Sequence, residues 1–486
     1  MKRLFSLLQF TLISSLITIA QVKTTLTLDE SISLALKQGY AVQNATSQYL
    51  SSKKSYEATL RKLRTSVNLT MDAPRFSESL SNQFNPITQR FEFYQLETVQ
   101  AQADLSISQP ILWTGGTLTL RESMFRRDQT GRGRDFFNGF SVEFRQPILS
   151  PNSHRISYDR AILGLEQSKS DFLRSQLDIV YAVSDGFYSL YQLVQRMEIL
   201  NIQVQQNEDS YQTAKNKYSA GLIPEVDVLQ SEVDLAQSQN DLLNSRRDLA
   251  SRKNTFRMLL GLQFSEEVEL TASFEFKPVA IDLEQAVTSA LKNRSEIRNA
   301  ESAKELRKID IFQAESRGSF RMDLSAAYGF NRTAGVLPDV FQDLNRTRNA
   351  VVSIQIPLFD WGSNALEVES AQIQYQNALA SFDDLQRRIR QEITDLINRV
   401  QLAESRLTVL EKVIAIAQKS YDISLERYKT GIINRNELAQ AQQRLTNAKL
   451  NNLSALIDYR LGLSDLKRKT LFDFEAGKPV EPMILE

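Results

Sequence analysis

The chain has 486 residues, and its 58 Lys and Arg side chains are balanced by 58 Asp and Glu side chains. A balanced charge gives no basic footprint for a polyanion and argues against a nucleic-acid partner. There is no cysteine, which excludes disulfide bonds and a lipidated N-terminal cysteine. Only 17 Gly and 11 Pro occur, which leaves room for long uninterrupted elements.

The N-terminus has the three-part layout of a secretory signal peptide. Met1-Lys2-Arg3 is followed by an apolar run from Leu4 to Ala20, which ends in small residues before Gln21. We therefore expect residues 1–20 to be a signal peptide. The alternative is a membrane anchor, but the run is short and contains polar side chains, namely Ser6, Gln9, Ser14 and Ser15. No later segment is apolar enough to span a membrane as a helix, so membrane contact would have to be made by strands.

Each half of the chain is predicted to begin with a helix and continue with strands. Helical periodicity runs from Leu28 to about Leu63 and again from Ile281 to about Gln313. Apolar and polar residues then alternate in several short stretches, which predicts strands within about 66–149 and about 319–359. We expect the segments rich in Arg, Phe and Asn to be exposed loops, at 126–140 and 331–349.

The longest feature of each half is a stretch without proline, from about Ile156 to Tyr218 and from about Asn364 to Tyr428. At 1.5 Å per residue each helix would reach roughly 90 to 100 Å, far beyond a helix of a globular domain. Apolar residues of the first stretch fall on two neighbouring heptad seams, which predicts a stave in a helical wall. The alternative is a helix within a compact bundle. Shorter helices are predicted to return at about 227–262 and 437–463, each followed by a short strand at 274–276 and 472–474.

The order of elements recurs because the chain contains two similar halves. The sequence SYQTAKNKYSAG ending at Gly221 returns as SYDISLERYKTG ending at Gly431. Gln146-Pro147-Ile148-Leu149 likewise has a counterpart at Gln355–Phe359. A duplicated helix end with a duplicated turn predicts two tandem structural repeats, at 21–279 and 280–474, with a C-terminal tail at 475–486.

The first repeat is longer than the second. The offset between Ala35 and Ala290 is 255 residues, whereas the offset between Pro147 and Pro357 is 210 residues, so 45 additional residues precede Pro147. They contain a second strand end, Gln109-Pro110-Ile111-Leu112. Because about 10 residues cross a bilayer on a tilted strand, we interpret the addition as an extra strand pair. A loop across residues 106–142 would contradict this interpretation.

Both tryptophans follow predicted strand ends. Trp113 comes directly after Leu112, and Trp361 lies two residues after Phe359. Membrane β-barrels carry aromatic girdles at this level, which predicts that Trp113 and Trp361 are membrane-interface aromatics. The alternative is a pair of ordinary core tryptophans.

These features resemble the TolC family of outer-membrane efflux channels over nearly the whole chain, from about Leu28 to Phe474. The most specific match is a doubled Tyr-x-x-Gly turn with an acid six residues after the glycine, formed by Tyr218, Gly221 and Asp227, then by Tyr428, Gly431 and Glu437. The resemblance implies a mainly α fold with a membrane β-barrel. Long antiparallel α-helical hairpins would form an α-barrel tunnel, and strands from three chains would share one outer-membrane β-barrel.

The resemblance also implies a cellular role. The protein would be a homotrimer in the cell outer membrane, in contact with outer-membrane lipid and extending into the periplasm. It would be the exit duct of a tripartite efflux or type I secretion system, joined through a periplasmic adaptor to an inner-membrane pump. An open sheet edge is costly in lipid, and a handful of strands does not close a barrel, so oligomerisation agrees with the strand content.

In the family the two turns converge and close the inner end of the tunnel. By position, Tyr428 and Asp227 would link neighbouring hairpins, Glu437 would occupy an acidic ring, and Tyr218 would complete the gate. Three copies of each acid around one axis repel one another and attract cations. The alternative role of Asp227 and Glu437 is to stabilise the positive end of the returning helix, and both roles can hold at once.

The chain departs from the family pattern at two positions. Ile433 stands where an arginine can contribute to the closed state, and Gln440 stands where a second acid can sit. These departures affect the contacts that would hold the tunnel closed and the number of charges in the acidic ring. The turn tips resemble the surface on which periplasmic adaptor hairpins dock, which assigns adaptor docking to Gly221, Leu222, Gly431 and Ile432.

The family has no catalytic chemistry, and we expect neither an enzyme nor a cofactor or metal site. His154 is the only histidine and is assigned to a loop. A periplasmic adaptor is the first alternative, but it would have one hairpin nested within β domains. A structural coiled-coil protein is the second, and it leaves the strands and tryptophans unexplained. The cargo, whether drugs, metals, lipids or peptides, would be chosen by the partner pump.

Overall fold

The computed structural model describes residues 23–130, 133–263, 267–271 and 276–480. The expected signal peptide, Phe274 and Glu275 of an expected strand, and the end of the expected tail lie outside these ranges. The chain forms two compact units. Unit 1 takes its residues from Met1–Ala45, Ser175–Ser289 and Glu392–Glu486, and unit 2 takes its residues from Thr46–Arg174 and Ala290–Gln391. Each unit therefore combines segments from both halves of the chain.

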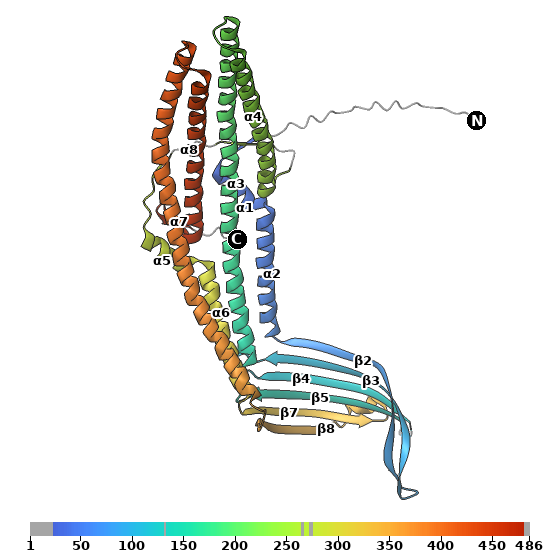
Figure 1. The fold of residues 1–486 in the computed structure, drawn as a ribbon. Helices are drawn as coiled ribbons and strands as arrows, with labels where there is room; N and C mark the ends of the chain where they lie inside the picture. The colour runs from blue at the N-terminus through green and yellow to red at the C-terminus, as the bar shows by residue number, and fades with distance from the viewer. Residues whose placement is uncertain (1–22, 131–132, 264–266, 272–275, 481–486) are drawn as a thin grey trace, which may run out of the picture. The chain divides into compact units, whose positions relative to one another are not determined.

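Two helical hairpins of identical element lengths dominate the fold (Figure 1). In the first, α3 (Ser153–Ser219, 67 residues) is followed by α4 (Glu225–Leu260, 36 residues). In the second, α7 (Ser363–Lys429, 67 residues) is followed by α8 (Arg435–Thr470, 36 residues). This repetition confirms the predicted duplication and the long antiparallel hairpins. Helix α8 runs seven residues past the expected end at 463, to Thr470.

The core of unit 1 lies between the helices of these hairpins. Val183, Phe187 and Leu190 of α3 are fully buried, and Phe187 meets Phe256 of α4 edge to face at 6.2 Å. Gly186 permits this contact, because a Cβ there would stand 2.9 Å from the Phe256 ring. Beside the helices, β1 (Lys23–Leu26) pairs in parallel with β6 (Glu267–Leu270), and β9 (Phe472–Asp473) pairs with β10 (Lys478–Pro479).

The helix predicted at the start of each half is broken in two. The first half has α1 (Leu28–Gln38) and α2 (Tyr40–Lys62), and the second has α5 (Leu283–Asn293) and α6 (Ser295–Arg317). The prediction of one continuous helix was wrong in both places. Gly39 and Arg294 adopt extended backbone angles, and a Cβ at Gly39 would stand 2.5 Å from the Ala35 carbonyl oxygen.

Unit 2 contains one six-stranded antiparallel sheet. Its strands follow the order β2-β3-β4-β5-β7-β8. The first half of the chain supplies four strands, β2 (Ser66–Asn85), β3 (Arg90–Pro110), β4 (Thr117–Gln129) and β5 (Gly133–Pro147). The second half supplies two, β7 (Arg321–Ala334) and β8 (Asn345–Gln355). The difference of two strands accommodates the 45 additional residues of the first repeat, and residues 106–142 are not a loop.

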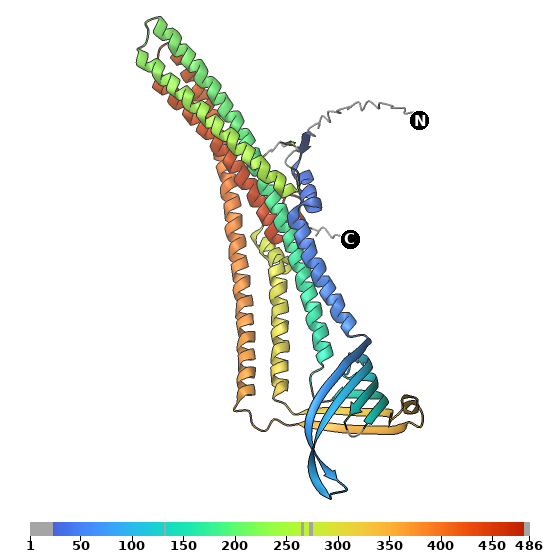
Figure 2. The same cartoon turned by 90° about the vertical axis from the view of Figure 1, so that its right-hand side faces the viewer.

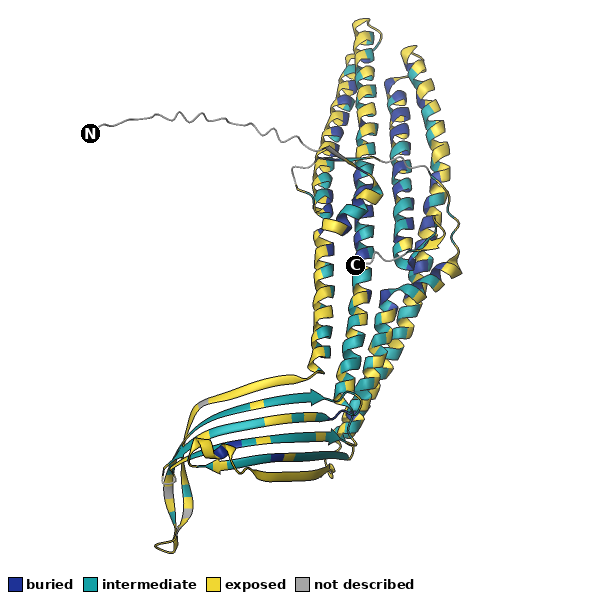
Figure 3. Ribbon diagram, turned by 180° about the vertical axis from the view of Figure 1, so that it is seen from behind, coloured by how far each residue is buried: buried dark blue, intermediate teal, exposed yellow. Residues whose placement is uncertain are grey.

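The sheet has one apolar and one polar face. Successive side chains of a strand point to opposite faces, and the strand registers align the apolar ones. The apolar face carries Val67, Leu69, Met71, Ala103, Leu105, Ile107, Leu118, Leu120, Met124, Phe140, Val142, Phe144, Ala326, Tyr328, Phe330, Ala350, Val352 and Ile354, and it is interrupted by Glu122, Asn138, Arg332, Arg346 and Arg348. The two edge strands, β2 and β8, are exposed almost throughout (Figure 3).

The segments expected as long loops are largely strand. Strand β4 continues to Gln129 and β5 begins at Gly133, so only a short connection remains of the loop expected at 126–140. Its aromatic residues pack within the sheet, since the rings of Phe125 and Phe137 stack at 4.8 Å. The loop expected at 331–349 is shortened by both flanking strands and holds a 3₁₀ turn, Leu337–Phe341. The β2–β3 pair runs on beyond the other strands as a two-stranded ribbon (Figures 1 and 2).

Two further observations concern single elements. His154 is the second residue of α3, so its assignment to a loop was wrong. Among the described residues, none of the helices combines the length and the apolar character needed to cross a bilayer.

Candidate functional site at the hairpin ends

The two hairpins of unit 1 end in the same turn. Gly221 and Gly431 have φ angles of 72° and 79°, in the left-handed region that only glycine adopts at little cost. The amide of Leu222 donates to the Lys217 carbonyl at 2.9 Å, and the amide of Ile432 donates to the Arg427 carbonyl at 2.9 Å. These bonds satisfy carbonyls at the end of each long helix. The duplicated sequence therefore produces a duplicated backbone.

The four residues assigned to adaptor docking lie at the turn tips. The Leu222 and Ile432 side chains are 72% and 64% exposed, and a Cβ at Gly221 or Gly431 would meet open space. Exposed leucine and isoleucine at a helix turn are available for a partner.

The two equivalent tyrosines differ in burial. Tyr428 is 3% exposed and packs with Tyr421, Leu438 and Leu445, whereas Tyr218 is 44% exposed. The Lys217 ammonium lies 4.1 Å from the centre of the Tyr428 ring and also donates to the Tyr428 carbonyl. The Tyr428 hydroxyl has no hydrogen-bond partner among the described residues. Burial raises the pKa of Tyr428, and the negative charge of Asp227 raises it further.

The two gate acids occupy equivalent positions but differ in their contacts. Each is the third residue of its returning helix, where a carboxylate favours the positive end of the helix dipole. Glu437 is held by the cap of α8, because Asn434 accepts from the Glu437 amide at 3.0 Å and donates to its carboxylate at 3.0 Å. Asp227 follows Pro224, which provides no side-chain cap. Among the described residues, the Asp227 carboxylate makes no hydrogen bond or ion pair, and no hydrogen bond joins it to Tyr428.

Arg435 is a residue of this site that sequence analysis missed. It is the first residue of α8, is 8% exposed, and forms an ion pair with Asp234 of α4. Its guanidinium also donates to the Ser231 hydroxyl at 3.0 Å and to the Gln230 carbonyl at 3.2 Å. A cation at a helix N-terminus opposes the helix dipole, so the acceptors of α4 compensate for an unfavourable position. The pairing partner is 201 residues away in sequence, which is why no local signal revealed it.

Two turns beyond Arg435 along α8, the hairpins share further polar contacts. Gln442 donates to the Asn207 side chain at 3.0 Å, and Asn207 donates to the Asp234 carbonyl at 3.1 Å. The hollow beside these residues has a volume of only about 10 Å³. These groups therefore hold α3, α4 and α8 together rather than forming a ligand cavity. Ile433, which replaces the arginine of the family pattern, packs against the Tyr428 cluster instead.

Both tryptophans lie in unit 2, beside strand ends. Trp113 is in the turn between β3 and β4 and is 85% exposed, and Trp361 lies between β8 and α7 and is 88% exposed. Neither tryptophan is therefore in the core of this chain. Trp361 meets Phe359 edge to face at 4.7 Å.

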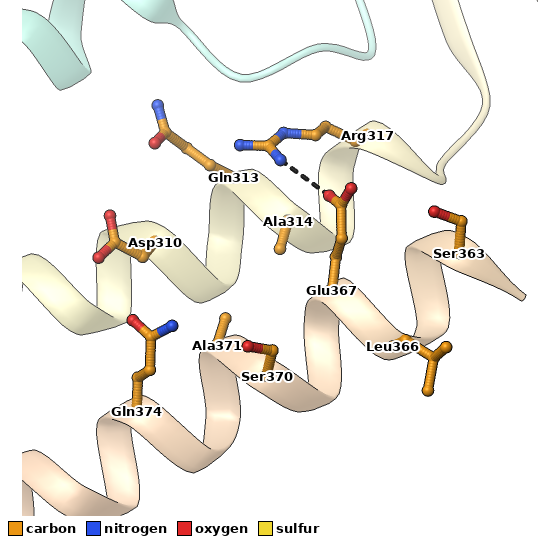
Figure 4. Close-up of a pocket in the computed structure, with 10 residues that line it drawn as sticks. All are labelled: Asp310, Gln313, Ala314, Arg317, Ser363, Leu366, Glu367, Ser370, Ala371 and Gln374. Atoms are coloured by element: carbon orange, nitrogen blue, oxygen red, sulfur yellow. Dashed lines mark hydrogen bonds and ion pairs between the residues drawn. The ribbon is translucent and has the colours of Figure 1, made fainter.

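A hollow of unit 2 lies between α6 and α7 (Figure 4). It has a volume of about 480 Å³, and the ion pair between Arg317 and Glu367, 2.8 Å long, crosses it. Its remaining lining is formed by Asp310, Gln313, Ala314, Ser363, Leu366, Ser370, Ala371 and Gln374. Within the described part of the chain, His, Cys, Asp and Glu side chains nowhere form a group of three suited to a metal ion.

The chain is similar to known outer membrane proteins in both sequence and fold. The family model described as "Outer membrane efflux protein" matches residues 94–262 and 286–467. The outer membrane protein TolC of Vibrio cholerae is 19% identical over 426 residues, which cover 85% of this chain and 96% of TolC. The probable efflux pump outer membrane protein TtgC of Pseudomonas putida is 21% identical over 59% of this chain and 58% of TtgC. The crystal structure of outer membrane protein VceC from Vibrio cholerae superposes with a TM-score of 0.69 at 17% identity, covering 93% of this chain and 97% of VceC.

Proposed function

Because the chain belongs to the outer membrane efflux protein family, we propose that it is the passive exit duct of a tripartite efflux or type I secretion system. As a member of this family it lies in the outer membrane and extends into the periplasm. The observation that carries the proposal is a sheet with one mainly apolar face and an unpaired edge on each of its outer strands, in a chain that also has two long helical hairpins. Neither a periplasmic adaptor nor a coiled-coil protein accounts for this combination.

The proposed assembly is a homotrimer. An unpaired strand edge is unstable in lipid, because each backbone amide or carbonyl group without a hydrogen bond costs about 2 kcal/mol or more there. Further copies of the chain supply the missing strands, so the apolar face of the sheet contacts lipid and the polar face lines a shared barrel. The hairpins of three copies would then form the periplasmic tunnel. After removal of residues 1–20, the repeats at 21–279 and 280–474 each contribute one hairpin to it.

The proposed partners bind at the periplasmic end of the duct. Gly221, Leu222, Gly431 and Ile432 form exposed turn tips on which an adaptor hairpin docks, and the adaptor connects the duct to an inner-membrane pump. The exposed Trp113 and Trp361 are assigned to the membrane interface, where an indole ring is favoured. The duct itself carries out transport without catalysis.

The proposed gate consists of Asp227, Glu437, Tyr428 and Tyr218. Three Asp227 carboxylates, which lack hydrogen-bond and ion-pair partners among the described residues, and three Glu437 carboxylates would surround one axis and bind cations. The buried Tyr428 supports the turn from within, and the exposed Tyr218 is available to a neighbouring copy.

Planar bilayer recordings test the gate. We expect the double variant Asp227→Ala/Glu437→Ala to have a higher single-channel conductance and weaker block by multivalent cations than the wild type. Asp241→Ala in α4, an acid far from the turn, is the matched control and should change neither property. Unchanged conductance and block in the double variant would remove the gate assignment.

Electron microscopy of detergent-extracted protein tests the duct itself. We expect three-fold symmetric particles that require detergent for solubility. A monomer that is freely soluble without detergent would contradict the proposed function.

A further inference from the structure

The sheet of unit 2 suggests a wider barrel than the duplication alone would build. Without the additional residues of the first repeat, each half of the chain would supply two strands and three copies would close twelve strands. With six strands in each chain, we propose that three copies close a barrel of eighteen strands, in which β8 of each copy pairs with β2 of the next. This inference rests on the proposed trimeric duct and adds the number of strands, the contact between copies and the pore width.

The additional strands are integral to the sheet. Strand β3 pairs with β4 over the full length of β4, from Thr117 to Gln129. The β2–β3 pair is therefore not an appendage that lies outside the sheet. The edges that remain for another copy are β2 and β8, rather than β4 and β8.

Strand direction suits a cyclic assembly. All neighbours in the sheet are antiparallel, so the first and last of its six strands run in opposite directions. A rotation about one axis therefore places β8 antiparallel to β2 of the next copy. The same face of the sheet stays outward at each contact, and the ring closes without a free edge.

The stagger between the strands of the sheet matches a closed barrel. Stepping straight across the sheet from Ser66, the partners are Ser108, Thr119, Glu143, Ala327 and finally Asn349. Strand β8 ends at Gln355, six residues beyond Asn349. Suppose that Gln355, rather than Asn349, lies opposite Ser66 of the next copy. The strand alignment then shifts by six residues for each chain of six strands, and this shift is the stagger of the barrel. This ratio of one residue per strand gives a tilt of about 36° in closed eight-stranded barrels.

This register also matches the faces of the two edge strands. It pairs Val67 with Ile354, Leu69 with Val352 and Met71 with Ala350, all of which belong to the apolar face. A shift by one residue would place these side chains opposite polar ones on the other face. The two edges are therefore complementary in the register that the stagger requires.

Eighteen strands make a wide pore. With strands about 4.8 Å apart and a tilt of about 36°, the backbone radius is about 17 Å, against about 11 Å for twelve strands. The lumen is lined by the polar face, which includes Asp104, Arg121, Glu143 and Arg145. Barrels of this strand number hold an aqueous channel. The barrel would thus pass bulky hydrated cargo, and the hairpin ends would limit its size.

Engineered disulfides test the contact, since the chain has no cysteine of its own. Opposed Cα atoms of an antiparallel pair lie about 4.5 to 5.5 Å apart, within the range that a disulfide bridges. We expect Leu69→Cys/Val352→Cys, oxidised in membranes, to form covalent trimers on non-reducing gels. The matched control is Leu69→Cys/Val351→Cys, whose second thiol points to the other face. It should yield about tenfold less covalent trimer.

A third variant separates the barrel proposal from the proposed function. Leu120→Cys/Val352→Cys reports pairing of β8 with β4, and its cross-linking would show a twelve-stranded barrel and overturn the inference while leaving a trimeric duct. Equal cross-linking of the first pair and its control, or none in a trimer, would also overturn it. A barrel radius near 11 Å by electron microscopy would do the same, whereas a soluble monomer would contradict the proposed function itself.

Discussion

The two hairpin ends share a backbone but differ in their side-chain contacts. Both turns use a left-handed glycine with the same amide-to-carbonyl bond. Around the second turn, Tyr428 is buried, Asn434 caps the helix and Arg435 reaches across to α4. The first turn has Pro224 and Glu225 at the positions equivalent to Asn434 and Arg435.

This difference separates two roles that the duplicated sequence assigns equally to both turns. The second turn holds the hairpins together, since its residues contact α3 and α4. The first turn leaves its tyrosine exposed and its acid without an ion pair among the described residues. Substitutions at the second turn should therefore reduce stability, and substitutions at the first should mainly change conduction.

The largest expected difference is between the two tyrosines. Tyr428→Ala removes a ring that is 3% exposed and leaves a cavity, so we expect a loss of about 3 kcal/mol in the free energy of unfolding. Tyr218→Ala removes a ring that is 44% exposed and should cost less than about 1 kcal/mol. Thermal unfolding of the detergent-solubilised protein measures both. Similar losses would show that the two turns are equally packed in the assembly.

The second prediction concerns the ion pair between the hairpins. Asp234→Ala leaves the buried Arg435 guanidinium without its counter-charge and should cost about 2 kcal/mol, less than a fully buried pair because Asp234 is 40% exposed. Arg435→Met removes the buried charge and keeps the volume, so it should cost less. Thermal midpoints of the two variants decide the order. A larger loss for Arg435→Met would mean that its bonds to Ser231 and Gln230 dominate.

Local features of the sequence were sufficient for the hairpins. Each glycine that ends a long helix imposes its own turn, and an uninterrupted helical pattern leads to it, so the turns were predicted within a residue or two. The strands at 126–140 were not predicted, because the arginines now found on β4 and β5 indicated a solvent-exposed loop. In the sheet Arg127 pairs with Asp135 of the opposite strand at 2.9 Å, a contact that register alone creates.

Contacts between distant segments were not predictable from one sequence. The break at Gly39 brings its backbone close to the Leu259 carbonyl of α4, which no local pattern indicates. The ion pair of Arg435 with Asp234 joins two helices of different repeats. The candidate gate residues were named from a resemblance, and the difference between Tyr218 and Tyr428 emerged only from packing.

Alkaline pH should lower the stability of the folded protein through the buried Tyr428. Burial, followed by the charge of Asp227, raises the pKa of Tyr428 in the folded protein above its ordinary value near 10. The folded state then holds this proton where the unfolded state has lost it, so stability is full below pH 10 and falls as the pH rises above it. The slope from one group is at most about 1.4 kcal/mol per pH unit.

Tyr428→Phe removes that slope and supplies the control. We expect the variant to lose less stability than the wild type between pH 10 and 11 in thermal unfolding. It also removes a buried hydroxyl without a partner among the described residues, so at neutral pH it should be as stable as the wild type or slightly more so. Identical pH profiles would show that Tyr428 is exposed to water in solution.

The smallest expected effect distinguishes the two helix caps. Asn434→Ala removes the side chain that accepts from the Glu437 amide and restrains the Glu437 carboxylate, and it should cost about 1 kcal/mol. Pro224→Ala at the equivalent position removes no side-chain bond and should cost less. Releasing Glu437 should also make its carboxylate resemble that of Asp227, so Asn434→Ala should strengthen block by multivalent cations in bilayer recordings. If block is unchanged while stability falls, Glu437 acts in the cap alone and Asp227 provides the charge of the gate.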